Sequence, residues 1–166
     1  MVLICDDIQD PGNLGTLLRT AEAVGVRSVW LTPGCVDVYS PKVVRAAMGA
    51  HFRLSVLPEQ RWSEIEREVT RLGLSGRVFA TDAHGEIDYA AIDWREPAAL
   101  IVSNEAHGLS AEAQELATRH GSTISIPMVG GTESLNAAVA ATIALFEAAR
   151  QRRLGVGPAK PAEVQP

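Results

Sequence analysis

The sequence predicts an α/β domain with a largely parallel sheet and helices on both faces. Short runs of β-branched and aliphatic residues alternate with longer amphipathic segments, which is typical of strands joined by crossover helices. The strand-like runs are apolar almost throughout, as expected where helices cover both faces of a sheet. A chain of 166 residues is long enough for one such domain with a substantial core.

Strands are expected at residues 2–5, 28–31, 54–56, 78–81, 99–103 and 123–126, and helices at 13–24, 42–48, 62–72, 110–120 and 134–152. Pro41 and Ser110 indicate helix starts, and glycines at 25, 49, 73 and 121 indicate stops. These elements place one domain at residues 1–153. Residues 154–166 lack periodicity, so a disordered tail is expected there.

The overall composition favours a globular, cytoplasmic protein. Hydrophobic residues make up 46% and charged residues 21%, and no apolar run approaches the roughly 20 residues that a membrane-spanning helix requires. No secretory or transit peptide is visible, and a first strand at residue 2 leaves no room for an upstream domain. The net charge of −5 gives no general attraction to nucleic acid, so any such site must be a local basic patch.

Cys5 and Cys35 are the two cysteines, and neither lies in a cysteine or histidine cluster. This argues against a disulfide framework, a zinc site and a redox motif, so no metal is expected.

A first segment of chemical interest reads D-P-G-N-L-G-T-L-L-R-T-A over residues 10–21. Alone it is a turn followed by a helix with Asn13 as its N-cap. Its glycine spacing is not G-x-G-x-x-G, which disfavours a Rossmann oxidoreductase. Arg19 is not explained by capping, and it lies roughly 240° around the helix from Asn13, so the two do not share a stripe.

Two further segments follow predicted strands. The strand at 99–103 delivers Asn104 and Glu105 at its carboxyl end before a turn at Gly108, where open parallel sheets bind ligands. Glu105 is alternatively an exposed loop acid, and His107 is interpreted as a bystander. The stretch I-P-M-V-G-G-T-E-S-L-N at 126–136 leads into an alanine-rich helix, for which Ser134 alone is interpreted as an N-cap.

Together and in this order, the three segments resemble the motifs of SpoU-like (TrmH-type) RNA methyltransferases, the 2′-O-ribose branch of the SPOUT superfamily. Residues 41–54 also resemble that family, particularly its members that modify ribosomal RNA. The resemblance covers residues 1–153. It implies a SpoU-like catalytic domain, a C-terminal trefoil knot, and a homodimer with the active site at the subunit interface.

The resemblance also implies the cofactor S-adenosyl-L-methionine, held by three loops. The residues carried over as its site are Thr81, Asp82, Ala83, Ser103, Asn104, Glu105, Gly108, Ile126, Pro127, Met128 and Leu135. Family members commonly have glycine where this chain has Ser103, so its hydroxymethyl group is expected to point away from the cofactor, with weaker adenosine packing at worst.

The catalytic residues that the resemblance implies are Asn13, Arg19, Glu105, Ser134 and Asn136, and the RNA-binding residues are Arg19, Lys42 and Arg45. Because arginine is effectively always protonated, Arg19 is expected to clamp a phosphate and polarise the 2′-hydroxyl, acting as a base only once desolvated. The expected reaction is methylation of a ribose in structured RNA, with rRNA slightly favoured over tRNA. The alternative is a non-catalytic cofactor- and RNA-binding module, or a catalytic domain separated from its RNA-recognition domain.

Overall fold

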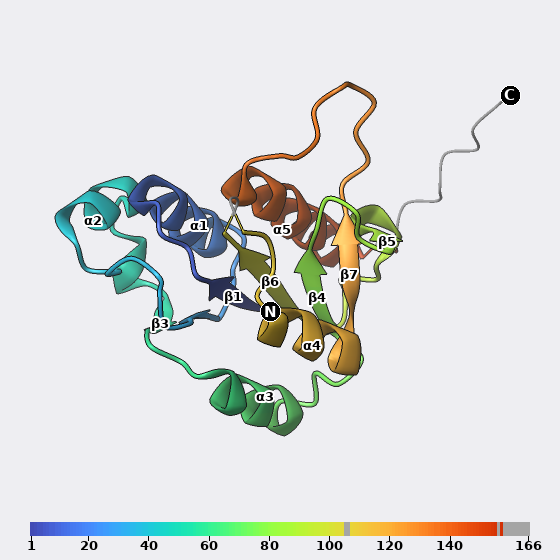
Figure 1. The fold of residues 1–166 in the computed structure, drawn as a ribbon, viewed down its shortest axis with the longest axis horizontal. Helices are drawn as coiled ribbons and strands as arrows, with labels where there is room; N and C mark the ends of the chain where they lie inside the picture. The colour runs from blue at the N-terminus through green and yellow to red at the C-terminus, as the bar shows by residue number, and fades with distance from the viewer. Residues whose placement is uncertain (105–106, 156, 158–166) are drawn as a thin grey trace, which may run out of the picture.

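The computed structural model describes residues 1–104, 107–155 and 157. Its core is a seven-stranded sheet in the order β3-β2-β1-β6-β4-β7-β5, and every pairing between neighbouring strands is parallel (Figure 1). The strands are β1 (Val2–Asp6), β2 (Ser28–Leu31), β3 (Ser55–Leu57), β4 (Val78–Thr81), β5 (Ile87–Asp88), β6 (Ala99–Ser103) and β7 (Gly121–Ser125). The predicted α/β class is therefore confirmed.

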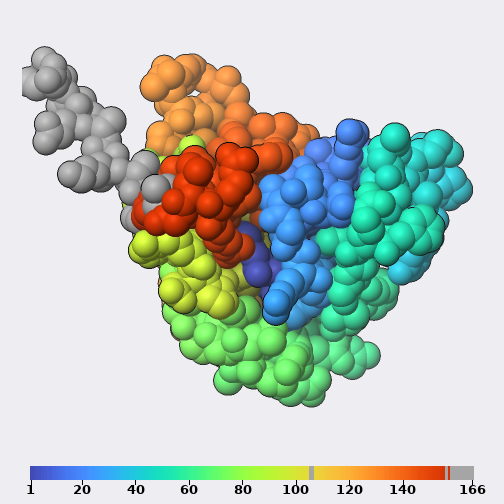
Figure 2. Space-filling view, turned by 180° about the vertical axis from the view of Figure 1, so that it is seen from behind, coloured from blue at the N-terminus to red at the C-terminus, as the bar shows by residue number. Residues whose placement is uncertain are grey.

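Helices cover both faces of this sheet, as predicted. They are α1 (Pro11–Ala23), α2 (Pro41–Ala47), α3 (Trp62–Arg71), α4 (Ala111–His120) and α5 (Ala137–Leu154), with 3₁₀ turns η1 (Ala50–Phe52) and η2 (Tyr89–Ala91). Alternate side chains of the central strands enter opposite cores: Leu3 and Leu100 pack with α1 and α5, whereas Ile4 and Ile101 pack with α3 and α4. Figure 2 shows α5 lying beside α1 on the first face.

Both helix starts in the motif segments differ from the prediction. Asp10, not Asn13, caps α1, because its carboxylate accepts a hydrogen bond from the Asn13 amide at 2.8 Å and Pro11 takes the first helical position. Asn136, not Ser134, caps α5 by accepting from the Val139 amide at 3.1 Å. In each case two residues that can cap a helix lie at most three positions apart. The path of the chain into the helix decides which of them is the cap.

The remaining differences concern short or shifted elements. The sequence predicted no β5, η1 or η2, because two or three residues carry no detectable periodicity. Strand β7 begins at Gly121, which was interpreted only as a helix stop. A Cβ at Gly121 would collide with the Val78 backbone of β4, so glycine is also what lets β7 start there.

Contacts of Trp94 and Gln151 hold the C-terminal helix α5 against the sheet. Trp94 is fully buried and packs edge-on against Phe79, with ring centroids 5.1 Å apart. The buried Gln151 amide accepts from the Trp94 backbone N–H at 2.9 Å and donates to the Ile92 carbonyl at 3.0 Å. Because a buried polar side chain is stable only when its hydrogen bonds are made, these bonds fix the position of α5.

The C-terminal predictions are only partly tested. Helix α5 ends at Leu154 rather than at residue 152, and Gly155 follows with a φ of 62°. Residues 156 and 158–166 of the predicted tail lie outside the described residues. The knotted path that the family resemblance implies is not decided by strand order, and it stays a prediction.

We predict that Gly15→Ala destabilises the domain by about 1–3 kcal/mol, the usual cost of overpacking a close contact. A Cβ at Gly15 of α1 would collide with the Ala46 side chain of α2 and lie 3.1 Å from the Ala47 amide nitrogen. Urea unfolding measures the change, and Ala46→Gly in the same chain should restore part of the loss. Since alanine is the better helix former by about 1 kcal/mol, a more stable Gly15→Ala variant would show that the two helices do not touch there.

Candidate cofactor cavity and its surroundings

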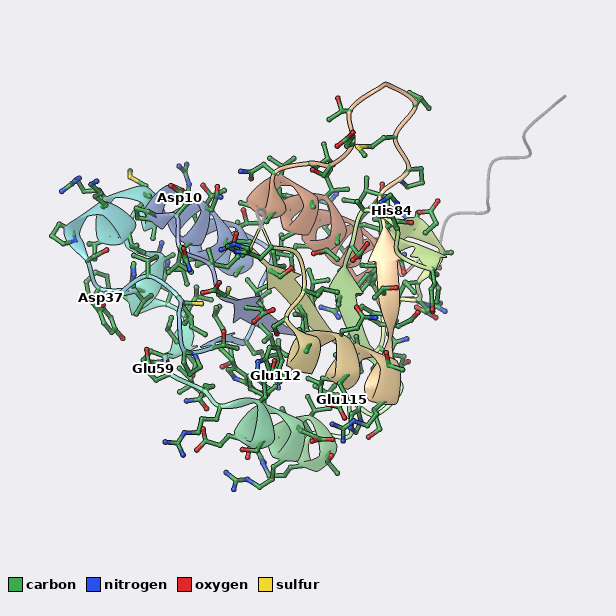
Figure 3. The ribbon with its side chains drawn as sticks, in the orientation of Figure 1. Asp10, Asp37, Glu59, His84, Glu112 and Glu115 are labelled. Atoms are coloured by element: carbon green, nitrogen blue, oxygen red, sulfur yellow. The ribbon has the colours of Figure 1, made fainter. Side chains whose placement is uncertain are left out.

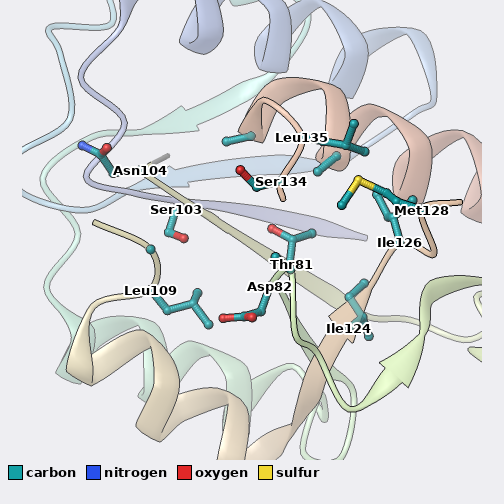
Figure 4. A pocket seen from close by; sticks show the side chains of 14 residues that line it. Thr81, Asp82, Ser103, Asn104, Leu109, Ile124, Ile126, Met128, Ser134 and Leu135 are labelled. Atoms are coloured by element: carbon teal, nitrogen blue, oxygen red, sulfur yellow. The ribbon is translucent and has the colours of Figure 1, made fainter. Parts of the chain in front are cut away.

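A cavity of about 200 Å³ lies at the edge of the sheet where β4, β6 and β7 end (Figure 4). It is lined by Thr81, Asp82, Ala83, Ser103, Asn104, Gly108, Leu109, Ile124, Ile126, Met128, Ser134, Leu135, Ala137 and Ala140. These residues come from the ends of three parallel strands, from the loops that follow them and from the start of α5. Ligands bind in this position in open parallel sheets.

The structure brings together most of the residues expected to hold a cofactor. Of that group, the cavity lining includes Thr81, Asp82, Ala83, Ser103, Asn104, Gly108, Ile126, Met128 and Leu135. Ser134, expected among the catalytic residues, lines it too. Pro127 is not part of the lining, and Glu105 lies outside the described residues.

Ser103 lies in the wall of the cavity. It is 7% exposed and belongs to the cavity lining, and Figure 4 shows its hydroxymethyl group among the side chains that surround the cavity. Ser103 is the last residue of strand β6. The expectation concerned a bound cofactor, so the direction of the hydroxymethyl group relative to the cofactor stays a prediction.

The sequence did not single out four apolar lining residues. Leu109 and Ile124 come from the loop after β6 and from β7, and Ala137 and Ala140 lie three positions apart in the first turns of α5. Spacing of three places both alanines on one face of a helix. Apolar residues of this kind carry no chemical signal, and only the packing of α5 against the sheet reveals them.

Strand β1 holds both ends of the loop between β6 and α4. The Asn104 amide donates to the Asp6 carbonyl at 3.1 Å, and its side chain donates to the Asp7 carbonyl at 3.1 Å. At the other end, the Ser110 amide donates to the Asp6 carboxylate at 3.0 Å. Figure 4 shows Asn104 at one end of this loop and Leu109 near the other. Asp6, which ends β1, and Asp7, which follows it, thus determine where this part of the cavity wall lies.

The Asp6 carboxyl is a buried group in this network, 3% exposed. Burial raises its pKa above the ordinary value of 3.8, and the hydrogen bonds from Ser110 partly oppose that rise. The carboxylate remains a good acceptor for Ser110, while removal from water makes its charge costly.

The three motif segments meet only in part. Asn136 Nδ2 of α5 donates to Asn13 Oδ1 of α1 at 3.1 Å, which joins the first segment to the third. Arg19 is exposed farther along α1, and Lys42 and Arg45 are exposed on α2. These three cations are not part of the cavity lining. Arg19 lies six residues after Asn13 on α1, so the two side chains leave the helix in different directions.

Cys5 and Cys35 are both free, as expected. Burial raises the pKa of each thiol, so both stay protonated at neutral pH. Within the described ranges, no cluster of His, Cys, Asp and Glu side chains suits a metal ion. None of the helices in that part of the chain is long and apolar enough to cross a membrane.

We predict that Asp6→Asn removes a pH-dependent loss of stability. Burial raises the native pKa above about 3.8, so the unfolded chain ionises first as pH rises. The wild type therefore loses stability between the unfolded and the native pKa, by at most about 1.4 kcal/mol per pH unit. Asparagine does not titrate, so the variant gains relative stability over the same interval. Urea unfolding across a pH series tests this, and a difference that is constant with pH would contradict it.

Figure 3 shows the acidic and basic side chains spread over the surface around this fold, with Asp10 at the start of α1.

Known proteins resemble the chain in both sequence and fold. The model of the SpoU rRNA Methylase family matches residues 1–146. The mitochondrial rRNA methyltransferase 3 of the mouse, Mus musculus, is 37% identical over 94% of this chain and 48% of its own length. A 23S rRNA uridine 2′-O-methyltransferase of Streptomyces viridochromogenes is 36% identical over 92% of this chain and 53% of its own length.

A solved structure of the SpoU methyltransferase AviRb from Streptomyces viridochromogenes, in complex with the cofactor AdoMet, has a TM-score of 0.84 and 36% identity. That comparison covers 93% of this chain and 61% of AviRb. The chain spans about half the length of the curated relatives it matches. The match to the family model over residues 1–146, with the shared fold, shows that this chain belongs to the SpoU rRNA methylase family.

Proposed function

We propose that this chain transfers a methyl group from S-adenosyl-L-methionine to a ribose 2′-hydroxyl of structured RNA, with rRNA favoured over tRNA. The observation that carries the proposal is the gathering of two of the three motif segments around one cavity in a chain of the SpoU family. Two comparisons support it: one match is named a 23S rRNA 2′-O-methyltransferase, and the AviRb structure contains AdoMet.

The cavity suits an adenosine-containing cofactor chemically. Ile124, Ile126 and Leu135 offer apolar surface for the faces of a ring. Asp82 supplies a carboxylate that can accept hydrogen bonds from ligand hydroxyls. A volume of about 200 Å³ is below the roughly 300–1,000 Å³ of typical ligand pockets, so part of the ligand would lie outside this cavity. When bound, S-adenosylmethionine supplies an activated methyl group.

The residues of the first and third segments act on the ribose in this proposal. A 2′-hydroxyl is a poor nucleophile until its proton is drawn off. Arg19 clamps the neighbouring phosphate and polarises the hydroxyl, because a guanidinium binds phosphate oxygens in a bidentate geometry. The hydrogen-bonded pair Asn13 and Asn136 orients the ribose. Ser134 belongs to the same site. Glu105 is proposed as a further catalytic residue, and it lies outside the described residues.

A homodimer is part of the proposal because Arg19 is not in the lining of its own chain's cavity. Helix α5 exposes Val139 and Phe146, at 46% and 53%, and a spacing of seven residues places them on one stripe. Large apolar side chains in such a stripe favour a protein contact. A second copy could then present its Arg19 to this cavity. Sedimentation velocity that shows only monomer at every concentration would contradict this.

Membership of the family decides neither the location of the protein nor the choice between two functions. A cytoplasmic location stays an expectation, and the mouse relative is a mitochondrial protein. The runner-up function is a non-catalytic module, or a catalytic domain that depends on a separate RNA-recognition domain.

We predict that Arg19→Ala lowers methyl transfer by a hundredfold or more, the usual order for loss of a charge-stabilising group, and leaves AdoMet affinity nearly unchanged. Transfer of labelled methyl groups from AdoMet to unmodified rRNA and tRNA measures the first effect, and calorimetry measures the second. Arg67→Ala, an exposed arginine of α3 on the other face, is the matched control. Equal loss of transfer and AdoMet affinity would contradict the RNA-side role, and no transfer by the wild type to either RNA would contradict the proposed function.

We predict that Ser103→Gly strengthens AdoMet binding by up to about fivefold, equivalent to about 1 kcal/mol or less. The change removes a hydroxymethyl group from the cavity wall. Glycine in a strand also costs roughly 0.5–1 kcal/mol of stability, so thermal unfolding should be followed alongside calorimetry. Weaker binding by a variant that remains folded would indicate that the serine hydroxyl contributes a contact instead.

A further inference from the structure

The outer side of α2 and the turn after it form an exposed ridge of mixed character. We define this α2–η1 ridge by Lys42, Arg45, Met48 and Phe52. Met48 is 67% exposed and Phe52 is 87% exposed, although both are large and apolar. The inner side of the same segment is buried against α1 through Val43, Ala47 and Ala50, so the ridge is not a loosely packed end of the chain.

The backbone of the ridge holds these side chains out. Met48 has a φ of 50° and Gly49 a φ of 81°, so two consecutive left-handed residues end α2 and start η1. Non-glycine residues rarely adopt this conformation. The Phe52 ring lies over the Gly49 turn, where a Cβ would be 3.8 Å from it. Nearby, Tyr39 is 61% exposed and packs against His51 at a tilt of 37°, with ring centroids 5.8 Å apart.

The ridge borders Arg19. Gly15, Arg19 and Glu22 are spaced four and three residues apart, so they share one stripe of α1. Gly15 packs against Ala46 of α2. Glu22 forms an ion pair with Arg53, just after η1, at 2.7 Å. Arg19 therefore lies between two points at which α1 touches α2 and the segment after η1.

The cations around the ridge are available for a ligand. Arg19, Lys42 and Arg45 form no ion pair with any carboxylate of the described residues, whereas Arg53 is paired with Glu22. Such cations beside exposed apolar and aromatic side chains match the chemistry of an unpaired nucleic-acid strand. Its phosphates require positive charge, and its bases stack on rings. In a duplex the base faces are already stacked and cannot use Phe52.

We propose that the α2–η1 ridge binds unpaired nucleotides next to the target ribose, with a base stacked on Phe52 and phosphates on Lys42 and Arg45. This inference rests on the proposed function and deepens it: the RNA is single-stranded where it crosses the ridge. Arg19 then meets the phosphate at the end of the bound stretch, because it borders the ridge.

The test uses the full chain and a short single-stranded RNA that contains 2-aminopurine, whose fluorescence reports stacking. Phe52→Leu keeps an apolar side chain but removes the ring, and Phe52→Trp keeps a ring. We expect Phe52→Leu to weaken binding of this RNA by about tenfold, which is within the range measured for base stacking. The same variant should abolish the change in 2-aminopurine fluorescence. Phe52→Trp should behave like wild type. Phe52→Leu and wild type should bind the same sequence equally when it is a duplex.

Controls separate this inference from the proposed function. Leu72→Ala, an exposed leucine after α3, should leave RNA binding unchanged, and AdoMet affinity should be equal in all variants that unfold at the wild-type temperature. Equal binding of single-stranded RNA by Phe52→Leu and wild type would overturn the inference. So would a change in sedimentation with no change in RNA binding, which would assign the ridge to a second copy. Methyl transfer by the wild type decides the proposed function independently.

Discussion

The parallel pairing of β1 with β6 at the centre of the sheet is the constraint on which the site depends. Its register joins Val2 to Ala99 and Asp6 to Ser103, so residues about a hundred positions apart end at one edge. The next residue continues the pairing, since the Asn104 amide donates to the Asp6 carbonyl. The Asp6 carboxylate then holds Ser110 at the start of α4. A shift of either strand would move the loop that forms one wall of the cavity.

Much of the fold follows from the apolar runs because a strand buried on both faces must be apolar throughout. The runs at 99–103 and 78–81 correspond to β6 and β4 with the same bounds. Strand β5 could not be predicted, since Ile87 and Asp88 form an edge strand too short for any pattern. The predicted helix caps were wrong for a different reason: either of two nearby residues could cap each helix, and only the path of the chain selects one.

The motif residues of the site were predicted from the sequence, and four apolar residues of the cavity lining were not. The loop residues after β4, β6 and β7 carry motif chemistry, and they do line one cavity. Ala137 and Ala140 line it only because α5 packs across the sheet, held in place by Gln151 and Trp94. Arg19 illustrates the opposite case. The sequence marked it as functional and placed it off the Asn13 stripe, but only the structure shows that it borders α2 and η1.

The cofactor side, built from the carboxyl ends of the strands, is therefore distinct from an RNA side built on α1 and α2. The central claim is that the two sides meet at a ribose hydroxyl. The most direct test is to map 2′-O-methylated nucleotides in total rRNA and tRNA from cells with and without the gene. We expect a ribose in unpaired RNA to lose its methyl group when the gene is absent. An unchanged ribose methylation map, or loss of a methyl group from a base, would contradict the claim.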